Sequence, residues 1–188
     1  MDELAALRRE ISALDTQILD LFARRMAAVE RVAEYKIREQ KPIHVPSREG
    51  EILASARGQT PEGLEGYGEA LVRTLLRLSR ERQYELFLEE EGAVMSGELA
   101  AVEGSGQGVL TLELDADPKA VAFVVDLFTD LGIAINRLEC LAKDSVRQRF
   151  LLEFSIDRGG SLVQRALYQL EQETTNLQLL SWHADAQP

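Results

Sequence analysis

Residues 4–36, "LAALRREISALDTQILDLFARRMAAVERVAEYK", give the clearest structural signal in the first half of the chain. Its apolar residues recur every three or four positions, and no glycine or proline interrupts the run from Asp2 to Gln40. This spacing predicts one helix of about forty residues, roughly 60 Å long at 1.5 Å per residue. Because such a helix exceeds the size of a small domain, we expect it to pack against another chain as well as its own.

Two cations of this helix lie on the face that should be buried. At about 100° per residue, Arg25 and Lys36 are roughly 20° apart around the helix. They share one stripe with the apolar residues Ile11, Leu14, Ile18, Val29 and Val32. An unpaired buried cation is costly, so either these side chains reach solvent or a neighbouring Glu, or an anion comes to meet them.

Two more helices are predicted in the first half. The segment "KPIHVPSRE", residues 41–49, ends the long helix with two prolines. Ser47 is the expected N-cap of a short helix from Arg48 to about Ala56, with Gly58 as its end. A third amphipathic helix is expected from about Glu69 to Glu91.

The rest of the chain has a different period. Residues 92–108 hold five of the thirteen glycines and are expected to be a linker between domains 1–91 and 109–188. Beyond it, strand and helix patterns alternate, at residues 108–116, 118–132, 133–144, 146–157, 161–176 and 177–184. The order β-α-β-β-α-β predicts a ferredoxin-like domain. The chain is therefore expected to be all-α in its first part and α/β in its second.

Composition excludes several classes of function. The formal net charge is −11, so binding to nucleic acid or to an anionic membrane is not expected. No apolar run reaches about 18 residues and the N-terminus lacks the plan of a signal peptide, so we expect a cytoplasmic protein. One cysteine, Cys140, and two distant histidines provide no metal cluster and no nucleophile–base pair. No cofactor is expected.

Further polar residues interrupt the apolar pattern. Ser79 and Gln83 lie one turn apart on the apolar face of the third helix, and Arg48 and Glu49 begin the short helix. Taken singly, the first two suit a hydrogen-bonded pair in a bundle seam, and the last two suit a solvated ion pair. Together with Arg25 and Lys36, they suggest a pocket for a small, multiply anionic ligand that carries a hydroxyl. Such a pocket suits catalysis by positioning and electrostatics.

With "SRE" at residues 47–49 and "LSRERQ" at residues 78–83, the opening helix resembles the all-helical class of chorismate mutases over residues 3–90. The resemblance implies rearrangement of chorismate to prephenate, one pericyclic Claisen step on the route to phenylalanine and tyrosine. It also implies an interlocked homodimer. Arg25 would hold one substrate carboxylate, and Arg8 of the partner subunit the other. Ser79 would assist a carboxylate, and Arg48 would support the cationic wall.

The resemblance assigns the remaining residues to the reacting centre. Lys36 and Gln83 would donate to the ether oxygen, where negative charge grows as the C–O bond breaks. Glu49 would accept a hydrogen bond from the ring hydroxyl. This family often has an acidic residue three positions before Arg48, where this chain has Val45. Glu49 would then carry the hydroxyl contact alone.

Residues 109–185 resemble an ACT domain, a small-molecule sensing module, as found in bifunctional chorismate mutase–prephenate dehydratases. The resemblance implies feedback control by phenylalanine or tyrosine. The chain departs from the effector motif at Lys119, where the family has glycine, and at Cys140, Leu141 and Ala142, where it has Ser-Arg-Pro. The effector is therefore left open, and a structural or dimerising domain is the alternative.

Two other functions are compatible with these patterns. An isochorismate pyruvate lyase uses the same helical fold and a similar cationic pocket. An amino-acid-binding regulatory protein could use the helical half as a dimerisation scaffold. The complete set of seven polar residues favours the mutase over both.

Overall fold

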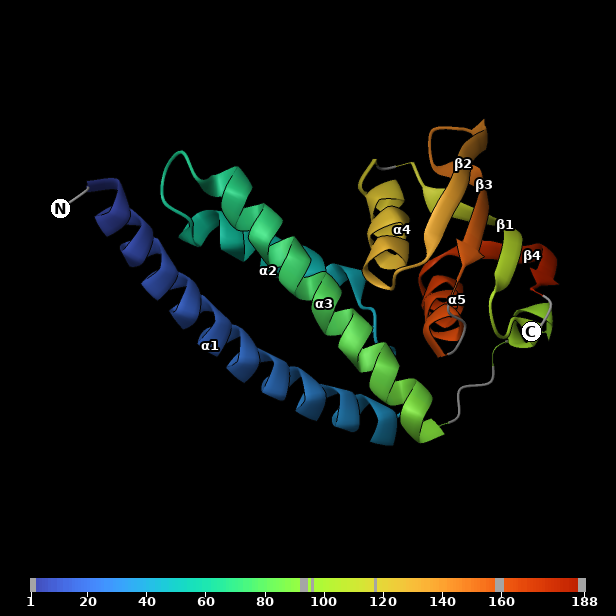
Figure 1. The fold of residues 1–188 in the computed structure, drawn as a ribbon, viewed down its shortest axis with the longest axis horizontal. Helices are drawn as coiled ribbons and strands as arrows, with labels where there is room; N and C mark the ends of the chain where they lie inside the picture. Colours follow the sequence, from blue (N-terminus) through green and yellow to red (C-terminus); the bar gives the residue numbers. More distant parts are fainter. Residues whose placement is uncertain (1–2, 92–94, 96, 117, 158–160, 186–188) are drawn as a thin grey trace. The chain divides into compact units, whose positions relative to one another are not determined.

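The computed structural model describes residues 3–91, 95, 97–116, 118–157 and 161–185 (Figure 1). The chain divides into two compact units, Met1–Phe87 and Leu88–Pro188. In the described part of the chain, no helix is both long and apolar enough to cross a membrane.

The first unit consists of the helices α1 (Glu3–Arg38), α2 (Pro46–Gln59) and α3 (Glu65–Glu91, whose last residues belong to the second unit). The three predicted helices are confirmed, but the start of α2 differs from its prediction. Its N-cap is Val45 and not Ser47, and no side chain caps it. Pro46 occupies the first turn, where the missing N–H needs no partner, and holds Val45 in an extended conformation.

The loop between α2 and α3 is shorter than predicted. Gly58 does not end α2, which continues to Gln59 and closes where the Thr60 N–H donates to the Ala56 carbonyl at 3.0 Å. The third helix begins at Glu65 rather than Glu69. Gly68 lies in its first turns, and a Cβ at this position would lie 2.0 Å from the Thr60 hydroxyl oxygen. Close approach of Thr60 thus explains a glycine that the sequence alone marks as loop.

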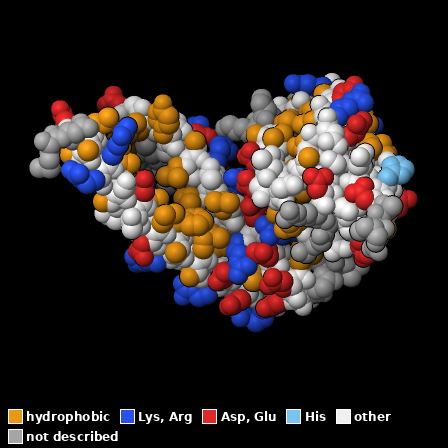
Figure 2. Space-filling view, in the orientation of Figure 1, with side chains coloured by type: hydrophobic (Ala, Val, Ile, Leu, Met, Phe, Trp, Pro, Cys, Tyr) orange, Lys and Arg blue, Asp and Glu red, His pale blue; other side chains and the backbone are white. Residues whose placement is uncertain are grey.

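Much of α1 has no cover within its own chain. Hydrophobic side chains are visible on the surface of the helical unit (Figure 2). Those of α1 that are at least half exposed and follow a seven-residue repeat are Leu4, Leu7, Ile11, Leu14, Ile18 and Leu21. Alternating steps of three and four residues are the signature of a helix that packs along another helix.

The second unit is a four-stranded antiparallel sheet with two helices (Figure 1). Its elements are β1 (Gly106–Asp115), α4 (Pro118–Asp130), β2 (Ala134–Lys143), β3 (Arg147–Ile156), α5 (Ser161–Glu173) and β4 (Thr175–Ala184). The spatial order is β2-β3-β1-β4, with Leu110 of β1 opposite Leu152 of β3. The predicted order of strands and helices is confirmed.

The core of this unit lies between the sheet and the two helices. It contains Leu112 and Phe154 from the sheet, Phe128 from α4 and Leu167 from α5, all fully buried. Part of the expected linker also contributes: Met95, Val102 and, from the short 3₁₀ helix η1 (Gly97–Ala101), Leu99 are buried in the same core. The glycines of residues 92–108 obscured this role in the sequence.

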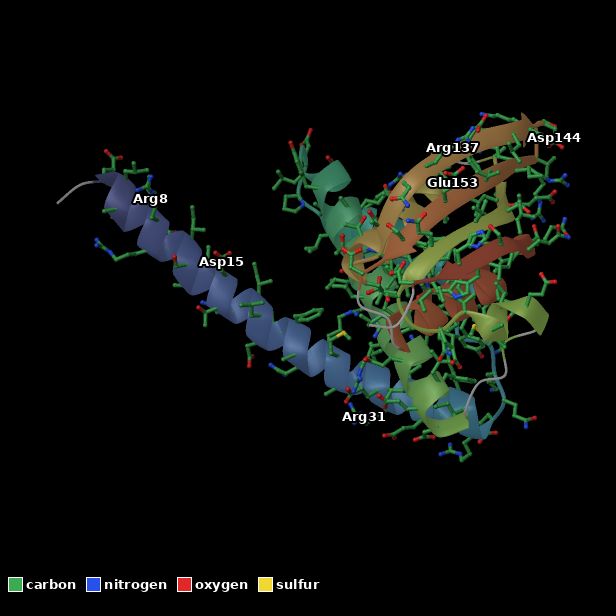
Figure 3. All side chains as sticks on the ribbon, turned by 45° about the vertical axis from the view of Figure 1, so that its right-hand side comes forward. Arg8, Asp15, Arg31, Arg137, Asp144 and Glu153 are labelled. Atoms are coloured by element: carbon green, nitrogen blue, oxygen red, sulfur yellow. The ribbon has the colours of Figure 1, made fainter. Side chains whose placement is uncertain are left out.

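The other face of the sheet is polar, and Figure 3 shows Arg137 and Glu153 there. Arg137 of β2 pairs with Glu153 of β3 at 3.2 Å and with Glu139 on its own strand. The β2–β3 turn is closed by Asp144, which accepts the backbone N–H groups of Val146 and Arg147 at 2.7 Å each. These bonds hold the pKa of Asp144 below its usual range. Charged pairs across the strands therefore form part of this face, beside the partly buried Val109 and Leu151.

Gly108 allows two aromatic rings to meet over β1. It pairs with Phe154 on one side and Trp182 on the other, and the two rings stack at a centroid distance of 6.1 Å. A Cβ at this position would lie 2.3 Å from the Phe154 ring. Because the core is closely packed, this ring has no free space into which it can retreat.

We therefore expect Gly108→Ala to destabilise the second unit by about 1–3 kcal/mol, the usual cost of overpacking. The measurement is urea unfolding followed by fluorescence of Trp182, the only tryptophan. Gln107→Ala, at the exposed neighbouring position of the same strand, is the control and should change stability by about 0.5 kcal/mol or less. An unchanged midpoint for Gly108→Ala would contradict the packing described here.

Candidate functional site

The first contact of the site joins α1 to α3 through a cation. Arg25 is partly buried, and its Nη1 donates to the Leu75 carbonyl at 3.1 Å and to the Ser79 hydroxyl. The Ser79 hydroxyl in turn donates to the Leu75 carbonyl at 2.5 Å. Burial lowers the pKa of Arg25. The cation is thus held by neutral oxygens.

Gln83 lies one turn further along α3 and is buried. Its Nε2 donates to the Ser79 carbonyl at 3.0 Å, which turns the amide along the helix. Its Oε1 is buried and, within the described residues, has no hydrogen-bond partner. One amide hydrogen and one acceptor oxygen of Gln83 are therefore left for a ligand.

Lys36 lies at the end of α1 and bends back over the loop that follows. Its Nζ donates to the Ile43 carbonyl at 2.5 Å, and Ile43 is itself buried. Burial lowers the pKa of Lys36, while the nearby Glu49 carboxylate opposes this shift. An ammonium has three hydrogens, so the contact with Ile43 leaves donors for another group.

Glu49 reaches the site from the first turn of α2 and meets two residues that the sequence analysis did not select. Arg80 of α3 places its Nη1 at 2.6 Å from both carboxylate oxygens, and His44 Nε2 lies 3.9 Å from one of them. The pKa of His44 is lowered by burial and then by Arg80, with Glu49 acting in the opposite direction. Arg80 directly follows Ser79 and lies three positions before Gln83. This position between two predicted site residues is the signal that the sequence offered.

Two predicted residues lie outside this group. Arg48 is exposed and pairs with Glu51 on its own helix at 2.8 Å. Arg8 is exposed near the start of α1 (Figure 3). Seventeen residues separate it from Arg25, which is about 25 Å along the helix. Arg8 of the same chain is therefore too far away to share a ligand with Arg25.

A groove of about 470 Å³ runs between α2 and the first half of α3. Its lining is mostly apolar or small, with Ile52, Ala56, Leu71 and Val72, and Arg48 at its margin. Arg25, Lys36, Glu49, Ser79 and Gln83 do not line it. The groove is therefore a feature distinct from the polar cluster, although Arg48 and Glu49 are neighbours in α2.

The charges of the cluster do not balance. Within the ranges that the structure describes, neither Arg25 nor Lys36 forms an ion pair with a carboxylate. With Arg80 included, the named residues hold three cations, Arg25, Lys36 and Arg80, and one carboxylate, Glu49, which leaves an excess of two positive charges. A partly buried excess of this size favours a ligand with two negative charges.

Comparison with known proteins finds similarities in the helical unit. Residues 7–84 match the family model of chorismate mutase type II. The chain is 42% identical over 82 residues to the T-protein of Enterobacter agglomerans, covering 44% of this chain and 21% of that protein. It is 46% identical over 53 residues to the bifunctional chorismate mutase/prephenate dehydratase of Aquifex aeolicus, covering 28% of this chain and 15% of that protein.

A third relative is the T-protein of Haemophilus influenzae, 32% identical over 84 residues, which cover 45% of this chain and 22% of that protein. The matched part of the chain therefore spans about a fifth of these relatives or less. The match of residues 7–84 to chorismate mutase type II agrees with the resemblance described above for residues 3–90. Each of these matches covers less than half of this chain.

The cluster predicts opposite shifts at His44. Arg80→Gln should raise the pKa of His44, because it removes a cation that disfavours the imidazolium. Glu49→Gln should lower it, because it removes the anion that favours the imidazolium. NMR titration of the imidazole resonances measures both shifts, and His183→Asn assigns the two histidines. Shifts in the same direction would show that the three side chains do not form one group.

Proposed function

We propose that the chain is a chorismate mutase, which rearranges chorismate to prephenate in phenylalanine and tyrosine biosynthesis. The observation that carries this proposal is the pair of partly buried cations, Arg25 and Lys36, held by neutral oxygens and without a carboxylate partner in the described structure. Chorismate is a dicarboxylate with a ring hydroxyl and an ether oxygen. Its two negative charges match the excess of two positive charges in the cluster.

Arg25 and Lys36 are proposed to bind different groups of the substrate. Arg25 presents a flat guanidinium and is proposed to hold a carboxylate, with Ser79 beside it. Lys36 offers a point charge to a single atom and is proposed to donate to the ether oxygen. Gln83 would donate its second amide hydrogen to the same oxygen. Glu49 would accept from the ring hydroxyl.

In the proposed reaction, no protein group forms or breaks a covalent bond. In one step the ether C–O bond breaks and a C–C bond forms, and negative charge grows on the ether oxygen. Donors fixed at that oxygen stabilise the transition state more than the ground state. Because Gln83 does not titrate, only Lys36 has to keep its proton for this contact.

A homodimer would complete the site. The exposed apolar repeat of α1, from Leu4 to Leu21, needs a partner helix, and the apolar groove beside Arg48 offers a surface for one. Arg8 of the same chain is about 25 Å from Arg25 along α1, so it would serve the site of the other subunit. We propose that Arg8 and Arg48 face the substrate only in that dimer.

We propose that residues 1–91 form the catalytic domain and that residues 109–188 form an ACT-like sensing domain. Residues 92–108 would join the two. The four-stranded antiparallel sheet with two helices supports this assignment. The altered effector motif, Cys140 to Ala142, lies at a register shift of β2 and is exposed. The side chain of Lys119 lies outside the described parts. An amino-acid effector is proposed without a choice between phenylalanine and tyrosine.

Turnover of chorismate tests the activity. We expect loss of chorismate absorbance, prephenate as product and no pyruvate. Lys36→Ala should lower kcat by about 100-fold or more, the scale of losing one donor to a developing oxyanion. Arg31→Ala removes an exposed cation of the same helix and is the control. Pyruvate release would identify a lyase, and absence of turnover would favour a non-catalytic binding protein.

Mixing two inactive variants tests the shared site. A heterodimer of Arg8→Ala and Lys36→Ala subunits contains one intact site, because both substitutions fall in the other site. With random exchange, about a quarter of the wild-type activity should return. Mixing Arg25→Ala with Lys36→Ala is the control, since every site then keeps a defect. Equal activity in both mixtures would contradict a site built from two chains.

A further inference from the structure

We propose that Arg80 is a positioning residue, which holds the Glu49 carboxylate toward the substrate hydroxyl and away from Lys36. This inference rests on the function proposed above and adds a residue to it. It depends on the juxtaposition of three charged side chains from three helices: Lys36 of α1, Glu49 of α2 and Arg80 of α3.

The contact between Arg80 and Glu49 is close and shielded. One nitrogen, Nη1, lies 2.6 Å from both carboxylate oxygens. The two side chains are only 13% and 21% exposed. Charge-assisted hydrogen bonds at this distance and burial restrict the rotation of the carboxylate. Each oxygen has further lone pairs, so the bond with Arg80 does not prevent a hydroxyl from donating to Glu49.

Lys36 is the competitor for the same carboxylate. Glu49 raises the pKa of Lys36, so the two groups interact although they form no ion pair in the structure. Without Arg80, Lys36 would be a cation within electrostatic reach of Glu49. A contact between them would occupy the acceptor for the hydroxyl and the donor for the ether oxygen at once. Arg80 therefore keeps apart two groups of opposite charge that the reaction needs separately.

Val45 makes this positioning more important in this chain. Val45 is exposed and lies at the N-cap of α2, and its apolar side chain cannot accept a hydrogen bond from the substrate hydroxyl. Glu49 is then the only carboxylate proposed for that contact. A single acceptor must be oriented by its neighbours, and Arg80 is the neighbour that contacts both of its oxygens.

The net charge of the site supports the same assignment. Arg80 neutralises Glu49, so Arg25 and Lys36 remain as two cations for a dianionic substrate.

The experiment compares Arg80→Gln with Arg82→Gln. Arg82 also lies on α3 and also pairs with a glutamate of another helix, Glu30, at 2.7 Å, but it is outside the cluster. We expect Arg80→Gln to lower kcat/KM for chorismate by about 100-fold, as for a displaced catalytic group. Arg82→Gln should stay within about twofold of wild type. Circular dichroism and urea midpoints establish that both variants fold.

A substrate analogue separates positioning from structural support. With chorismate in which hydrogen replaces the ring hydroxyl, Arg80→Gln should cause a smaller loss than it does with chorismate, because the hydroxyl contact of Glu49 is then absent and only the capture of Lys36 remains. In a Glu49→Gln background, Arg80→Gln should add about twofold or less. Arg80→Lys keeps the charge and should recover part of the loss.

The outcomes distinguish this inference from the proposed function. An active wild type with an equally active Arg80→Gln variant would overturn the role of Arg80 and leave the mutase intact. An equal loss on both substrates would also overturn it, because Arg80 would then act on the fold or on the carboxylates. An inactive wild type would overturn the proposed function, and this inference with it.

Discussion

The central constraint in the helical unit is the partial burial of two cations, Arg25 and Lys36, whose hydrogen-bond partners are neutral oxygens. The Ser79 hydroxyl and the carbonyls of Leu75 and Ile43 satisfy some of their hydrogens without neutralising their charge. A folded chain can carry such an excess only if a ligand compensates it or if water reaches it in the free state. The proposed role of the polar cluster as an anion site accounts for this excess of positive charge.

Other arginines of the same unit are paired with glutamates, in contrast to Arg25 and Lys36. Arg57 and Arg73 both meet the buried Glu69, Arg77 meets Glu81, and Arg82 meets Glu30 and Glu85. Glutamates are therefore abundant beside arginines on these helices. The chain could have paired Arg25 and Lys36 in the same way, and among the described residues it does not. The contrast supports the proposal that Arg25 and Lys36 bind a ligand, whereas the paired arginines stabilise the bundle.

The second unit is stabilised by different interactions from the first. Its core is apolar and closed by two helices, and its outer face depends on charged pairs between strands. Glu113 is one example: two hydrogen bonds from Arg149 and one from Asn176 hold its pKa below the usual range. The bulge of β2 at residues 140–142 disturbs the sheet where the effector motif of the resembling family would lie. A sensing role would have to use this altered surface.

The helices, the strands and most members of the cluster could be predicted from the amino-acid sequence. Uninterrupted helical spacing indicates α1, alternation indicates the strands, and polar residues on apolar faces point to Arg25, Lys36, Glu49, Ser79 and Gln83. The packing of the elements was needed to show that Arg80 and His44 lie beside Glu49, that Arg48 pairs with Glu51, and that Met95, Leu99 and Val102 are buried in the core. The physical reason is that periodicity reports which face a residue occupies on its own helix, whereas partners are set by how separate helices pack.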